Sequence, residues 1–150
     1  MKARICRPGL LVMLIALCHL APALAGDAGV VKTLKGKVSV QRGNELLDAG
    51  LGMVVQTADR IVTGDKSAVG ITLKDNTLLT AGPNAVLSLD RFKFDPKTEK
   101  GELEANVRRG SLSVISGKLA KSSPENVQFK TASVTLGVRG TEFIIEVADR

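Results

Sequence analysis

The chain has little of the chemistry on which most enzymes and metal sites depend. Its 150 residues include two cysteines, one histidine, no tryptophan and no tyrosine. Cys6, Cys18 and His19 all lie within the first 25 residues. A chain that loses this segment has no thiolate or imidazole nucleophile, no disulfide and no zinc site built on Cys or His. Without Trp and Tyr, it also lacks the side chains that most often stack on bases and sugars.

The first 25 residues have the features of a secretory signal peptide. Lys2, Arg4 and Arg7 precede an apolar run over residues 10–20, and a small-x-small cleavage site follows at residues 23–25. The run is too short to span a membrane, and no later segment approaches the ~20 apolar residues of a spanning helix. We therefore expect export to the periplasm and no membrane span in the mature chain.

Lipoprotein processing at Cys18 is the alternative interpretation of this segment. Leu17 stands immediately before Cys18, at a position where lipoprotein signals have Gly, Ala or Ser. We therefore favour cleavage after Ala25 over acylation of Cys18.

Cleavage after Ala25 defines the expected domain organisation, with a signal peptide over residues 1–25 and one domain over residues 26–150. The 125 remaining residues (150 − 25) are enough for one core that buries roughly two-thirds of the unfolded surface. Three of the 21 basic residues leave with the signal peptide, so 18 face 15 acidic residues and the net charge falls from +6 to +3. So small a charge on an exported chain argues against a nucleic-acid partner.

The mature chain alternates between apolar and polar residues with period two, and no segment has a helical period. Roughly ten short strands without helices predict an all-β, single-domain sandwich or roll, with a short right-handed β-helix as the alternative. Either fold would bury the same aliphatic and aromatic side chains. The expected core is Val38, Val40, Ile61, Ile71, Leu73, Leu87, Leu89, Leu112, Val114, Val134, Leu136, Phe143 and Ile145.

Turn-forming residues separate these strands. Gly43-Asn44 and Asp75-Asn76 predict tight hairpins, and residues 95–101 predict the tip of a longer one. Gly64 is expected to be free to adopt a positive φ. Arg109-Gly110 predicts a further turn before a strand over residues 111–115, and residues 116–126 predict a loop.

The run from Thr131 to Val147 is the most informative stretch. Val134, Leu136 and Val138 fall on one face of a strand, and Phe143, Ile145 and Val147 fall on one face of the next. Gly140 interrupts the pattern between them, which predicts a bulge or a close backbone approach there.

This run resembles the closing motif of FecR-domain proteins, with its R-G-T-E-F corner at residues 139–143. Residues 57–65 resemble the family's gD-I-x-T-G signature, and residues 69–79 its v-x-L-x-D-g-t-x-l hairpin, with Asn76 where glycine is usual. Residues 83–89 resemble its p-n-S-x-l-x-l element, with Ala85 in place of serine, and the segment around Gly110 its l-x-x-G-x-l step. The resemblance covers residues 36–147.

The resemblance implies a bacterial, all-β domain with a periplasmic role in sensing or protein interaction. The FecR regulators that the chain resembles couple outer-membrane iron receptors to sigma factors. We expect no cytoplasmic anti-sigma segment before the domain and no retained membrane helix, and therefore no signalling across a membrane by this chain alone. The expected partner is an envelope protein such as an outer-membrane receptor or regulator. The alternative is a cell-wall or envelope accessory protein, structural or glycan-binding.

No arrangement of residues predicts catalysis, a cofactor or a metal. Lysines interleave with Asp95, Glu99, Glu102 and Glu104, which is typical of a solvated hairpin. Other carboxylates, at Asp59, Asp65 and Asp75, stand at turns, where they commonly bond to local backbone N–H groups. Neither Ser-x-x-Lys nor Gly-x-Ser-x-Gly occurs in the mature chain. The basic residues that could bind an anionic glycan are Arg108, Arg109, Lys118 and Lys121.

Three residues near the chain's last strand are the candidate partner contacts. Arg139 and Glu142 flank the Gly140 corner, and Ile145 lies in the strand that follows. FecR-like proteins often continue with a further strand, so we expect the edge over residues 143–147 to be unpaired and open to a partner strand.

Overall fold

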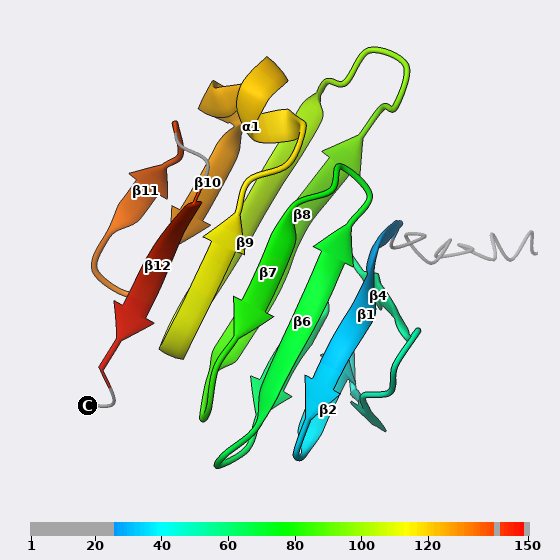
Figure 1. Cartoon of the computed structure of the whole chain (residues 1–150), viewed down its shortest axis with the longest axis vertical. Coiled ribbons are helices and arrows are strands. Elements are labelled where there is room, and N and C mark those ends of the chain that lie inside the picture. The colour runs from blue at the N-terminus through cyan, green and yellow to red at the C-terminus, as the bar shows by residue number, and fades with distance from the viewer. Residues whose placement is uncertain (1–25, 140–141, 149–150) are drawn as a thin grey trace, which may run out of the picture.

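The computed structural model (Figure 1) describes residues 26–139 and 142–148. Because apolar and polar side chains alternate along its strands, the chain folds into two facing β-sheets. The described residues form twelve strands and two short helical turns. The strands are β1 (Asp27–Lys35), β2 (Val38–Arg42), β3 (Glu45–Asp48), β4 (Val54–Gln56), β5 (Arg60–Thr63), β6 (Ala68–Leu73), β7 (Leu78–Ala81), β8 (Val86–Phe94), β9 (Gly101–Ile115), β10 (Val127–Lys130), β11 (Thr135–Gly137) and β12 (Glu142–Val147). The helical turns are α1 (Leu119–Ser122) and the 3-10 turn η1 (Pro124–Asn126).

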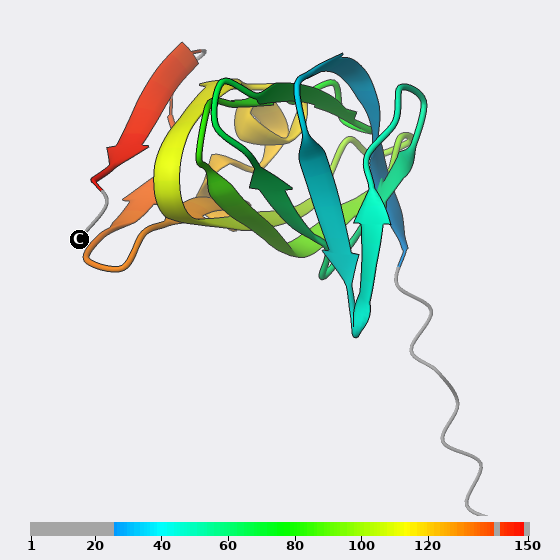
Figure 2. The ribbon, with the colours of Figure 1, turned by 90° about the horizontal axis from the view of Figure 1, so that it is seen from below.

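Strand pairing defines the two sheets. Sheet A has the order β4-β1-β6-β7-β9-β12, and sheet B has the order β3-β2-β5-β8-β9-β10-β11. Every pair is antiparallel except β9–β10, which is parallel. Figure 2 shows the sheets as facing layers joined by the curved β9. The expected all-β sandwich or roll is confirmed, and the β-helix alternative is wrong because a β-helix requires parallel coils.

β9 belongs to both sheets. Its first part pairs with β8 and β10 in sheet B, and its last part pairs with β7 and β12 in sheet A. The change occurs at Gly110, where φ is +80° and the register with β8 shifts nearby. The predicted turn at Arg109-Gly110 is therefore wrong. Gly110 bends one continuous 15-residue strand instead of ending it.

The core lies between the two sheets and is mainly aliphatic. Ten of the thirteen expected core residues are buried: Val38, Val40, Ile61, Ile71, Leu73, Leu87, Leu89, Leu112, Val114 and Ile145. Phe143 is partly buried and packs against this core. Val134 and Leu136 are exposed by 52% and 37%, so their expected burial is wrong.

The tight turns form largely as predicted. Gly43 and Asn76 have positive φ angles in the hairpins β2–β3 and β6–β7, and the long β8–β9 hairpin turns at residues 95–100. Gly64 does not have a positive φ. The left-handed conformation in this turn belongs to Lys66 instead. The loop expected over residues 116–126 contains α1 and η1.

Asp75 joins the β6–β7 turn to the segment before α1. Its buried carboxylate accepts hydrogen bonds from the Thr77 N–H (3.0 Å), the Thr77 hydroxyl (2.7 Å) and the Leu119 N–H (3.3 Å). The Gly117 N–H in turn donates to the Thr77 hydroxyl (3.0 Å). These bonds satisfy a charge that would otherwise be costly to bury, so Asp75 is structural, as its turn position predicted.

We expect Gly110→Ala to destabilise the fold. An added Cβ would lie 2.5 Å from the Ala85 Cα, and an L side chain rarely adopts this φ. Strain and crowding together should cost about 1–3 kcal/mol of unfolding free energy in urea melts. Gly50→Ala is the matched control, because nothing lies within 4 Å of its Cβ position. Equal midpoints for the two variants would contradict the proposed bend.

Candidate functional site

The candidate site is the free edge of β12 at one end of sheet A. Within residues 26–139 and 142–148, β9 is the only strand that pairs with β12, in a register from Glu142↔Ile115 to Val147↔Gly110. Figure 1 shows β12 as the outermost strand of the front layer. The unpaired edge expected from the sequence is confirmed for these residues.

Backbone directions identify which residues of β12 face the free edge. The Gly82 N–H donates to the Ser111 C=O on the β7 side of β9 (2.9 Å). Successive residues of an antiparallel strand direct their N–H and C=O groups to opposite sides, so Leu112 and Val114 direct theirs toward β12. Their register partners are Ile145 and Phe143. Ile144 and Glu146 therefore direct their backbone groups away from β9, toward the free edge.

Side chains of β12 also alternate. Ile145 is 5% exposed and points into the core, as its place among the expected core residues predicted, so its side chain is not accessible to a partner. Ile144, which the sequence reasoning missed, is 66% exposed on the outer face of sheet A. The signal was present, because the alternation that buries residues 143 and 145 must expose residue 144.

Two other predicted contacts lie beside this strand. Arg139 is exposed in the segment between β11 and β12, and Glu142 is exposed at the start of β12. No ion pair joins them among the described residues. Gly140, expected to form a bulge between them, lies outside the described residues.

The two sheets end unevenly at this side of the molecule. The Phe143 ring of β12 packs edge-on against the Phe129 ring of β10, with centroids 5.3 Å apart. β12 therefore covers β10, and β11 extends one strand further. Leu136 of β11 is the register partner of Phe129, so its side chain shares the inner face. Leu136 is exposed because no described strand of sheet A lies beyond β12, and Val134 is exposed in a hollow that it lines together with Val147 and Ala148.

The family model described as FecR protein matches residues 59–150. The chain belongs to the FecR family. No curated protein and no solved structure gives a significant match. The matched region contains β12, β11 and the Gly110 bend of this FecR chain.

The FecR signature segment at residues 57–65 is structural in this chain. Arg42 donates two hydrogen bonds to the buried Asp59 carboxylate, at 2.9 and 2.7 Å, and the Gln56 N–H donates a third at 2.8 Å. The bond to Asp59 raises the pKa of Arg42. The Thr63 hydroxyl donates to the Gly82 C=O and accepts from the Ala85 N–H. These groups hold β2, β5 and β8 together, which agrees with a structural role for Asp59.

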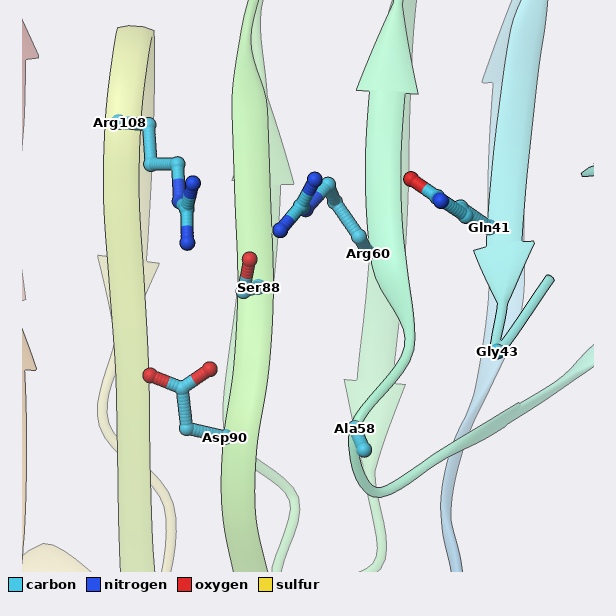
Figure 3. A pocket seen from close by; sticks show the side chains of 7 residues that line it. All are labelled: Gln41, Gly43, Ala58, Arg60, Ser88, Asp90 and Arg108. Carbon is cyan, nitrogen blue, oxygen red and sulfur yellow. The ribbon is translucent and has the colours of Figure 1, made fainter.

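A shallow polar hollow lies on the outer face of sheet B. Figure 3 shows the side chains of Arg60 and Arg108 on either side of Ser88, with Asp90 beside them. The Ser88 hydroxyl is buried and has no hydrogen-bond partner. Two guanidinium groups and a hydroxyl can together bind a carboxylate or phosphate, although Asp90 reduces the local positive charge.

The described part of the FecR chain offers little else for chemistry. It contains no group of three His, Cys, Asp or Glu side chains arranged to hold a metal ion. None of its helices is long and apolar enough to cross a membrane. Lys118 and Lys121 lie at α1, where Lys118 pairs with Glu99 at 2.7 Å.

We expect prolines at two adjacent positions of β12 to have different effects on stability. Ile145→Pro removes an N–H that bonds to β9 and disturbs the core, so it should cost about 3 kcal/mol or more. Ile144→Pro removes an N–H that faces the free edge, where proline is tolerated, so it should cost about 1 kcal/mol or less. Circular dichroism and urea melts measure both. A larger loss at residue 144 would show that the assigned backbone directions are wrong.

Proposed function

We propose that this FecR-family chain is an exported periplasmic module that binds an envelope protein through the free edge of β12 and catalyses no reaction. The observation that carries the proposal is the row of outward backbone groups at Ile144 and Glu146, next to an exposed isoleucine side chain. A partner strand could pair with these groups without rearranging the domain.

The edge has few of the features with which proteins usually prevent strand addition. Lysine, proline, bulges and covering loops commonly protect exposed edges. β12 has the sequence Glu-Phe-Ile-Ile-Glu-Val and contains neither lysine nor proline, and its pairing with β9 has no register shift. Unpaired backbone groups beside an exposed aliphatic side chain favour recognition of an extended segment.

The composition of the chain supports a binding role more than an enzymatic one. Residues 26–150 contain no histidine and no cysteine, and two buried carboxylates, Asp59 and Asp75, are occupied by structural hydrogen bonds. Membership of the FecR family supports a sensing or regulatory role in the envelope. An outer-membrane receptor or a regulator is therefore the class of partner that we propose.

Binding of an anionic envelope glycan is the second candidate function. The hollow between Arg60 and Arg108 supports it, since the Ser88 hydroxyl there lacks a partner. The β12 edge favours protein over glycan, because its free backbone groups match the spacing of another strand.

Export predicts a defined amino terminus. Mass spectrometry of the protein recovered from the periplasmic fraction should give a chain that begins at Gly26. An intact Met1, or a lipid-modified Cys18, would contradict cleavage after Ala25.

Partner binding at β12 predicts site-specific cross-linking. A photoreactive amino acid at residue 144 should form an adduct with an envelope protein in living cells. The same group at Leu51, which is 70% exposed in a turn, is the control and should not form this adduct. Excess untagged wild-type protein should suppress the adduct in envelope extract, whereas untagged Ile144→Pro should not.

The mass and composition of the adduct distinguish the candidate functions. A glycan adduct formed from residue 144 would overturn the protein partner, and a glycan adduct formed from the same group at Arg108, in the hollow, would support the second candidate. Equal competition by the wild type and by folded Ile144→Pro would overturn binding at the β12 edge.

A further inference from the structure

We propose that the segment that adds to β12 is an extended stretch of another protein with the order basic-aliphatic-aliphatic-aliphatic-basic. This inference rests on the proposed function and specifies the chemistry of its partner. It follows from the outward glutamates on β12 and from two exposed aliphatic side chains, Leu136 on β11 and Val134 just before it.

The outer face of β12 supplies the charge preference. Glu142, Ile144 and Glu146 alternate along this face, and all three side chains are exposed. Within residues 26–139 and 142–148 no ion pair neutralises either glutamate. In an added strand, the side chains opposite residues 142 and 146 lie on the same face as the glutamates. Lysine or arginine at these two positions would complement both charges, with an aliphatic residue opposite Ile144.

The inner face supplies the apolar preference. Phe143 contacts Phe129 of β10, so a strand added beyond β12 would lie opposite β11, which is the next strand of sheet B. Neighbouring strands are about 4.8 Å apart in both sheets, so the added strand would lie as far beyond β12 as β11 lies beyond β10. The inward side chains of the added strand would then cover Val134 and Leu136, which are exposed by 52% and 37%. Burial of this aliphatic surface favours aliphatic residues at the inward positions.

A second copy of β12 is a poor occupant of the same edge. Antiparallel pairing centred on Ile144 places Glu142 opposite Glu146 of the other copy at both ends, and parallel in-register pairing also places glutamate opposite glutamate. Like charges directly opposite one another destabilise a strand pair. A shift by one residue would relieve the repulsion but exchange the inner and outer faces, and an antiparallel shift by two would keep the faces but place Ile144 opposite a glutamate and leave both glutamates without a cation. The geometry therefore favours a different chain.

Binding of short peptides to the mature protein tests the inference. One peptide carries Lys-Val-Ile-Val-Lys between Ser-Gly flanks, a second carries Glu-Val-Ile-Val-Glu, and a third carries Val-Lys-Ile-Lys-Val, which moves the lysines to the inward positions. Fluorescence polarisation should give at least tenfold tighter binding for the first peptide than for the other two. Because ion pairs cause the preference, it should weaken as salt is raised.

Charge reversal provides the matched control. The double variant Glu142→Lys, Glu146→Lys should prefer the glutamate peptide over the lysine peptide. An edge that binds extended peptides without charge selectivity would show no such reversal. Folded Ile144→Pro should bind none of the peptides. Binding of the lysine peptide by Ile144→Pro at wild-type affinity would show that the peptide occupies another surface, and would overturn the inference.

The remaining outcomes separate this inference from the proposed function. Equal binding of the lysine and glutamate peptides, lost in Ile144→Pro, would overturn the charge preference and leave edge binding intact. If no peptide binds while the residue 144 cross-link persists, the partner sequence proposed here is wrong and the edge remains the site. A dimer in sedimentation that Ile144→Pro abolishes would assign the edge to a second copy and overturn the inference.

Discussion

The bend of β9 at Gly110 is the constraint on which the rest of this structure depends. One continuous strand carries hydrogen bonds for sheet B before the bend and for sheet A after it. The positive φ of Gly110 and its close approach to Ala85 leave no space for a side chain. Because the two sheets share this strand, its position sets how they face each other and where each of them ends.

The uneven ends of the sheets follow from this arrangement. β10 pairs with the first part of β9 and is followed outward by β11, whereas β12 pairs with the last part and is outermost in the described sheet A. Sheet B therefore extends one strand beyond sheet A at this side. The same offset exposes Leu136 and leaves the β12 edge without a neighbour among residues 26–139 and 142–148, so one geometric cause produces both features of the candidate site.

Family membership and geometry support the same kind of role. The FecR model match covers the part of the chain that contains the bend, the signature turn and the last strand. In that part the signature residues Asp59 and Thr63 hold strands together, and β12 offers backbone groups to solvent. The motifs that identify the family thus build the scaffold, and binding is proposed at its edge.

The local pattern of the sequence determined the fold class, most of the core and most of the turns. Alternation of period two is a property of a strand's own residues, so Val38, Ile71 and Leu112 could be assigned to the inner face before any pairing was known. Asn76 and Gly43 marked hairpins because few other residues tolerate a positive φ. For the same local reason, the sequence indicated that residues 134 and 136 share one face.

Tertiary structure alone decided whether that face is covered. Burial of Leu136 requires a strand in the opposite sheet, and which strands lie opposite depends on pairings between residues far apart in the chain. The bend at Gly110 resembled a turn in the sequence, because glycine permits both and only the partners of β9 distinguish them. Finding which residues of β12 direct their backbone N–H toward the free edge likewise required the register with β9, since the direction of a backbone N–H is set by its neighbour strand.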